Sequence, residues 1–170
     1  MRILLFVTSI YDTFEDVSGD DFKKIIEKLE EIAEIEQDQR ILISFCDETE
    51  NKNIFTYYFR NILDEIEGKN IKLGHQFLGN FYYKDIYKGG ALLYDDIYNK
   101  EREILKYVKW LEDNENFVNL YYVDSSANND VINELFCEEK NVNLNIINEN
   151  LKGKGIASSL EEKKLILEKK

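Results

Sequence analysis

The stretch RILLFVTSIYDTF, Arg2–Phe14, decides the fold. Its first part, Arg2–Val7, is a nearly continuous apolar run, which is typical of a strand buried in a parallel sheet. The run then stops in a polar turn that carries Ser9, Tyr11 and Asp12. In open α/β sheets, ligand sites lie just beyond the carboxyl ends of such strands. The stretch therefore predicts a buried first strand with a candidate site at its end.

Helical and strand-like patterns alternate along the rest of the chain. Between residues 18 and 37, one apolar stripe recurs at three- and four-residue spacing, which predicts a helix. The stripe consists of Phe22, Ile25, Ile26, Leu29, Ile32 and Ala33. Further helices are predicted at 53–68, 100–114 and 128–139, and further strands at 40–46, 117–126 and 141–147. The segment 71–84 is predicted to form a strand, a turn and extended chain.

This order predicts an α/β fold: a three-layer, Rossmann-like, mostly parallel sheet with helices on both faces. A length of 170 residues suits a single core. We expect one Rossmann-like domain over residues 1–150. Residues 151–170 are expected to form a flexible glycine-containing link followed by an amphipathic C-terminal helix over Ser158–Lys170.

The composition narrows the class of protein. The formal net charge is −12, and 44% of the residues are apolar, which argues against a disordered chain. An acidic chain is a poor binder of duplex nucleic acid, because phosphate neutralisation needs an excess of Lys and Arg. No apolar run approaches the ~20 residues of a membrane span, and no signal-peptide cleavage pattern follows the first run. We expect a cytoplasmic protein with no membrane contact, whose acidity either maintains solubility or serves a basic partner.

The cysteine and histidine content offers little for metal or redox chemistry. Cys46 and Cys137 do not form a CxxC pair, and we expect both to be buried free thiols. His75 is the single histidine, so a His-rich metal site is excluded.

Polar clusters follow three of the predicted strands, as TSIYDTF, SFCDETEN and VDSSANND. Because the carboxyl ends of parallel strands meet at one edge of the sheet, these clusters form the candidate site. The plainer interpretation remains open. Hydroxyl and Asx side chains commonly satisfy loop amides, as in turns and helix N-caps.

The first cluster resembles the opening motif of the haloacid dehalogenase-like (HAD-like) superfamily of phosphatases and phosphotransferases. That motif is a strand ending in Asp-x-Asp-Gly-Thr, and the resemblance extends over residues 2–147. It puts Ser9 at the nucleophile position and Tyr11 at the general-acid position. Asp12 stands where the family has glycine, and Thr13 retains the threonine.

The later motifs of that superfamily have counterparts in the same order. Ser44 resembles the Ser or Thr that ends the next strand in the family. The lysine of the third motif corresponds to Lys88 or Lys100, and spacing does not decide between them. The resemblance gives Asp124 and Asp130 the role of magnesium ligands.

At the matching positions, the chain lacks the two carboxylates that carry the family's chemistry. A carboxylate at the first position is anionic at neutral pH and attacks phosphorus, whereas Ser9 is neutral and has no neighbouring histidine base in the sequence. Tyr11 is a poor general acid for this cycle. We therefore predict a non-catalytic binding or regulatory protein with no cofactor. One version is an inhibitor or antitoxin-type partner of a basic nucleic-acid-binding protein.

Two alternatives stay open. In the first alternative, the chain is a divergent Mg-dependent phosphatase or phosphodiesterase that uses Asp12, Asp124 or Asp130 in an altered arrangement. The sheet topology also permits a small nucleotide-binding sensor. Tyrosine is enriched in protein interfaces, and the chain is rich in aromatic residues that favour a protein-contact surface. These are Tyr57, Tyr58, Phe59, Phe81, Tyr82, Tyr83, Tyr87, Tyr94 and Tyr98.

Overall fold

The fold is described from a computed structural model of the chain. The structure describes residues 1–8, 20–48, 71–78, 80–83, 100–123, 129–147 and 151–170. Within these ranges, only the backbone is described for residues 44–48, 71–78, 80–83, 100 and 103.

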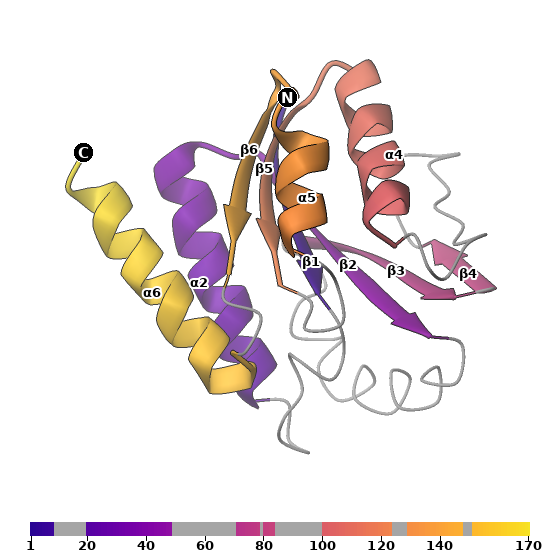
Figure 1. Cartoon of the computed structure of the whole chain (residues 1–170). Helices are drawn as coiled ribbons and strands as arrows, with labels where there is room; N and C mark the ends of the chain where they lie inside the picture. The colour runs from indigo at the N-terminus through magenta and orange to yellow at the C-terminus, as the bar shows by residue number, and fades with distance from the viewer. Residues whose placement is uncertain (9–19, 49–70, 79, 84–99, 124–128, 148–150) are drawn as a thin grey trace.

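The described strands form one six-stranded sheet in the order β4-β3-β2-β1-β5-β6 (Figure 1). The strands are β1 (Arg2–Thr8), β2 (Arg40–Glu48), β3 (Ile71–Leu78), β4 (Asn80–Tyr83), β5 (Phe117–Tyr122) and β6 (Val142–Ile146). All neighbouring pairs are parallel except β3 and β4, which are antiparallel. The predicted α/β fold with a mostly parallel sheet is therefore confirmed, and it is compatible with a Rossmann-like arrangement.

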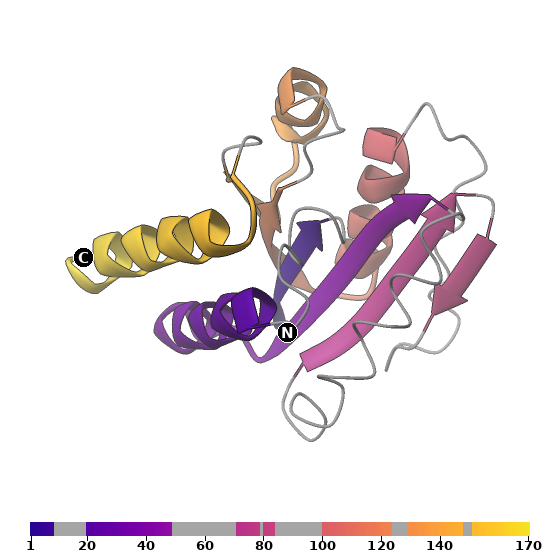
Figure 2. The ribbon, with the colours of Figure 1, turned by 90° about the horizontal axis from the view of Figure 1, so that it is seen from below.

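The described helices lie on both faces of this sheet (Figures 1 and 2). They are α2 (Asp20–Glu36), α4 (Lys100–Asp113), α5 (Asn129–Phe136) and α6 (Gly153–Glu168). Helices α2 and α6 pack on one face, and α4 and α5 pack on the other. Strand β1 serves both cores by alternation, since Leu4 and Phe6 face α2 while Ile3, Leu5 and Val7 face α4.

The apolar stripe of α2 is buried as the spacing predicts, with every member 5% exposed or less. In α4, Ile104, Val108 and Leu111 face the core as expected, and Trp110 packs beside them. The predicted helix at 53–68 lies outside the described residues. The same holds for Tyr57, Tyr58, Phe59, Tyr87, Tyr94 and Tyr98, and for the side chains of Phe81, Tyr82 and Tyr83.

The C-terminal segment differs from the expectation of a flexible link. α6 begins at Gly153, so the glycine-containing stretch is helical, and Ile156 and Leu160 are fully buried against the α2 face. A side chain at Gly155 would come within 3.1 Å of Leu151 Cδ2, so glycine permits this close approach. Across the helix pair, Lys28 Nζ lies 2.7 Å from Glu161 Oε2. α6 is therefore an integral part of the core.

The prediction that Cys137 is buried is wrong. Cys137 directly follows the last turn of α5, is exposed, and its thiol donates to the Glu134 carbonyl at 3.0 Å. Burial at α5 instead falls on Ile132 and Phe136. Among the helices that the structure describes, none is long and apolar enough to cross a bilayer.

Candidate functional site

The first candidate site is at the carboxyl edge of the sheet, where the order in which strands are added reverses on the two sides of β1. From β1 the chain proceeds through β2 and β3 on one side, and later returns to pair β5 with the other side of β1. Val7 thus lies between Ser44 of β2 and Tyr122 of β5, and the Val123 N–H donates to the Val7 carbonyl at 2.9 Å. Ligands of open α/β sheets bind at such a topological switch point. The carboxyl edge of the sheet at β1 and β5 is therefore the first candidate site.

Most of the sequence-predicted site residues follow directly on this switch point but are not themselves described. Ser9, Tyr11, Asp12 and Asp124 lie outside the described residues, as does Lys88. The last described residues before them, Thr8 and Val123, are both buried.

Ser44 does not end its strand, so that part of the expected motif is wrong. β2 continues four residues further, to Glu48, and pairs with β3 along this extension. The reason is that β3 supplies a hydrogen-bonding partner beyond the point where β1 stops at Thr8. Ser44 is nevertheless level with Val7, near the end of the central strand.

Lys100 and Asp130 open two helices on the same face of the sheet. Lys100 is the first residue of α4, which runs back to the amino edge before β5 begins. Asp130 is an exposed residue in the first turn of α5, where an acid interacts favourably with the helix dipole. Both helix starts therefore lie toward the carboxyl edge. In the part of the chain that the structure describes, no group of three or more His, Cys, Asp or Glu side chains forms a metal site.

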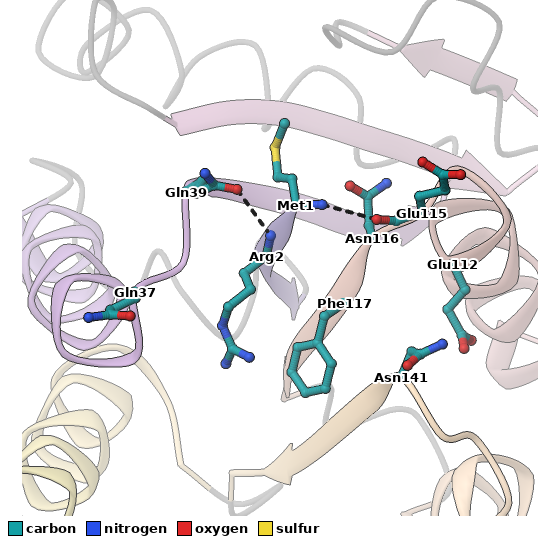
Figure 3. A pocket seen from close by; sticks show the side chains of 9 residues that line it. All are labelled: Met1, Arg2, Gln37, Gln39, Glu112, Glu115, Asn116, Phe117 and Asn141. Atoms are coloured by element: carbon teal, nitrogen blue, oxygen red, sulfur yellow. Dashed lines mark hydrogen bonds between the residues drawn. The ribbon is translucent and has the colours of Figure 1, made fainter.

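A second candidate site lies at the opposite, amino edge of the sheet (Figure 3). It is an open cavity of about 740 Å³ between the starts of β1 and β5 and the end of α4. Its lining is mostly polar: Met1, Arg2, Gln37, Gln39, Glu112, Glu115, Asn116, Phe117 and Asn141. Sequence reasoning missed this cavity because its residues come from four separate segments.

Arg2 is the main cation of the amino-edge cavity, but its charge is already engaged. Its Nε donates to the Glu36 carbonyl at 3.2 Å and lies 3.5 Å from Asp38 Oδ1. Its Nη2 lies 3.6 Å from Glu36 Oε2, and its guanidinium carbon is 4.4 Å from the centre of the Phe117 ring. Two acids and one aromatic face thus hold the guanidinium, which leaves little free charge for an anionic ligand.

Behind Arg2, a buried polar cluster joins the turn after α2 to the far edge of the sheet. Asn119 is fully buried in β5, and its Nδ2 donates to Asp38 Oδ2 at 3.1 Å. The Asn119 Oδ1 accepts from Asn143 and Asn145 of β6, at 3.1 and 3.0 Å. Burial raises the pKa of the Asp38 carboxyl, whose side chain has no exposed surface. The cluster fixes β5 and β6 to the end of α2.

Two other ionisable groups near these elements have shifted pKa values. Burial raises the pKa of Tyr121, and the negative charges of Glu36 and Asp38 add to this effect. Burial also raises the pKa of Glu112, and the neighbouring Glu139 carboxyl raises it further. Both shifts favour the neutral form of the group, so they indicate structural burial rather than a free nucleophile.

Comparison of the chain with protein-family models, curated proteins and solved structures finds no match in any of the three.

Proposed function

We propose that the chain is a non-catalytic binding or regulatory protein on a degenerate, three-layer HAD-like scaffold, and that it acts in the cytoplasm by contact with a basic protein. The single observation that carries the proposal is the acidic outer stripe of α5. Asp130 and Glu134 of α5, and Glu138 two residues beyond the end of the helix, are spaced four residues apart and are all exposed; together they are called the acidic stripe of α5. α5 itself contains no basic residue, and the exposed Lys140 follows two residues after Glu138.

The other described helices support the choice of α5 as the docking surface. α2 also carries exposed acids, Glu27 and Glu34, but its sequence includes lysines, and Lys28 is engaged with Glu31 and Glu161. A net charge of −12 steers the chain toward a positive surface over long range, as on a protein whose basic groove binds nucleic acid. An inhibitor or antitoxin-type role follows if the chain covers that groove. Tyrosines outside the described residues would add contact area.

The test is affinity capture from the native cell with three versions of the chain. One is the parent, one carries Glu134→Lys with Glu138→Lys, and the matched control carries Glu27→Lys with Glu34→Lys on the opposite face of the sheet. Both variants change the net charge equally. We expect the parent and the α2 control to retain one basic protein that the α5 variant loses. Equal capture by all three, or no basic protein at all, would refute the proposal.

A second candidate function is favoured by the register at the carboxyl edge. The chain would be a divergent Mg-dependent phosphatase or phosphodiesterase, because the switch point between β1 and β5 directly precedes Ser9 and Asp124. If so, Asp124 and Asp130 are the magnesium ligands, and Ser9, Tyr11, Asp12, Ser44 and Lys100 are the candidates for the remaining roles. A panel of phosphoesters with Mg²⁺ or Mn²⁺ tests this function. Turnover that Asp124→Asn abolishes in a folded chain would favour the enzyme over the binding protein.

A further inference from the structure

β6 is the outermost strand at one edge of the described sheet (Figure 1). It pairs with β5 on one side, and two backbone hydrogen bonds show which residues of β6 direct their N–H and C=O groups toward β5. The Val118 N–H donates to the Asn141 carbonyl at 2.8 Å, and the Ile147 N–H donates to the Tyr122 carbonyl at 2.9 Å. In a parallel ladder with this register, every second residue of β6 turns its backbone groups toward β5.

The remaining residues turn their backbone groups away from the sheet. The backbone N–H and C=O groups of Asn143 and Asn145 point toward β5. Those of Val142, Leu144 and Ile146 therefore point outward. Within the described ranges, no hydrogen bond reaches these outward groups. All three residues are only half-buried. Among the described residues, nothing pairs with this row of donors and acceptors.

Among the devices that protect natural sheet edges are a charged side chain, a proline and a bulge, besides a short strand or a covering segment. β6 reads VNLNI and has none of the first three, although the chain as a whole carries a net charge of −12. Two copies of so acidic a chain repel each other, and a contact surface without charge adds least to that repulsion. The edge of β6 is such a surface.

We propose that β6 pairs in antiparallel fashion with β6 of a second copy of this chain. The three outward residues are symmetric about Leu144. With Leu144 opposite Leu144, Val142 of one copy lies opposite Ile146 of the other, and all outward groups of both strands are paired. A two-fold axis relates the copies, so the assembly closes as a dimer instead of growing into a filament.

The side chains fit this register on both faces of the strand. On the α4 and α5 face, aliphatic residues oppose aliphatic residues, which stabilises cross-strand pairs. On the other face, Asn143 of one copy lies opposite Asn145 of its partner copy. The Asn143 amide uses one N–H on Asn119 Oδ1, so its second N–H is available to an Asn145 Oδ1 across the axis.

Sedimentation velocity on the full chain tests the assembly, from about 10 µM to about 500 µM and at low and high salt. We expect a dimer whose population rises with concentration and whose Kd falls at high salt, because salt screens the repulsion between acidic copies. A chain that stays monomeric over this range overturns the proposal.

Val142→Pro locates the interface. It removes an outward N–H while leaving the bonds to β5 intact, and proline is tolerated at the first residue of an edge strand. We expect at least a tenfold weaker dimer, whereas the control Val142→Thr keeps the N–H and the affinity. An unchanged Kd in folded Val142→Pro protein overturns the proposal.

Hydrogen exchange on the unmodified chain gives a readout that needs no variant. The outward amides of Val142, Leu144 and Ile146 are expected to exchange at least tenfold more slowly at high concentration, while those of Asn143 and Asn145 are protected at every concentration. Equal exchange of the outward amides at low and high concentration contradicts the pairing.

The dimer does not depend on the proposed function, and the two respond oppositely to salt. Binding of a basic partner weakens as salt rises, whereas the homodimer strengthens. Glu134→Lys with Glu138→Lys removes the basic partner but leaves the backbone bonds of β6 in place. Failure of one proposal is therefore distinguishable from failure of the other.

Discussion

Asn119→Ala is the substitution that probes the polar cluster most sharply. The change removes the amide that donates to Asp38 Oδ2 and accepts from Asn143 and Asn145. The Asp38 side chain has no exposed surface, so its carboxylate loses a partner that water does not replace, at a cost of about 1–3 kcal/mol. Asn143 is exposed and Asn145 half-buried, so their amides are rehydrated at little cost. The cavity left behind adds about 1 kcal/mol.

The expected loss in the free energy of unfolding is therefore about 2–4 kcal/mol. Urea denaturation followed by circular dichroism measures it, provided that the m-value is unchanged. The matched control is Asn143→Ala, which removes only the exposed end of the cluster and should cost less than about 1 kcal/mol. A double-mutant cycle with Asp38→Ala should show a coupling of about 1 kcal/mol or more. Equal stability of Asn119→Ala and the parent, or zero coupling, would refute the reasoning.

Three further predictions concern α6, Glu112 and Cys137. Leu160→Ala, at a fully buried position of α6, should lower the free energy of unfolding by about 2–5 kcal/mol. Leu165 on the same helix is 45% exposed, so Leu165→Ala should leave the free energy of unfolding nearly unchanged. Similar urea midpoints for the two variants would show that α6 does not pack on the rest of the fold. The raised pKa of Glu112 means that the folded chain holds this proton more tightly than the unfolded chain, so stability falls as pH rises from the unfolded pKa of about 4.3 through the folded pKa. Glu112→Gln should flatten this part of the pH profile of urea stability, and an unchanged slope would contradict the assigned burial beside Glu139. The exposed Cys137 thiol should react with a thiol reagent in the native state, and a native labelling rate unchanged by Cys137→Ser would contradict its exposure.

Local periodicity in the sequence was sufficient to predict most of the described helices and strands. The α2 stripe from Phe22 to Ala33 predicts both the helix and its buried face, because a single helical face had to meet the sheet. The apolar run that opens the chain likewise predicts the central strand, since only a strand buried on both faces reads as continuously apolar.

The start of α6 was mispredicted because glycine is a poor helix former in isolation. Here tertiary packing outweighs that preference: Ile156 and Leu160 are buried against the α2 face, and Gly155 lets the helix approach Leu151. Cys137 was mispredicted because helical spacing does not reveal that α5 ends one residue earlier, at Phe136.

The candidate sites were harder to predict from the sequence than the helices and strands. Parallel strand direction follows from the alternation of elements, and it places the ends of β1, β2 and β5 at one edge; the strand order itself comes from the structure. The amino-edge cavity and the cluster around Asn119 arise from residues far apart in the sequence: Met1 and Glu115, which line the cavity, are 114 positions apart, and Asn119 and Asp38 are 81 positions apart. Such contacts depend on register, which a single sequence does not reveal. An asparagine in the middle of the apolar run FVNLYYV was the one local signal of a buried polar cluster.

The central claim is that this chain acts by contact through the acidic stripe of α5. Its most direct test is the equilibrium affinity of the captured basic protein for the purified parent, for Glu134→Lys with Glu138→Lys, and for Glu27→Lys with Glu34→Lys. Calorimetry at low and moderate salt should give at least a tenfold weaker Kd for the α5 variant alone, with weaker binding of the parent as salt rises. Equal affinity of all three chains would contradict the account.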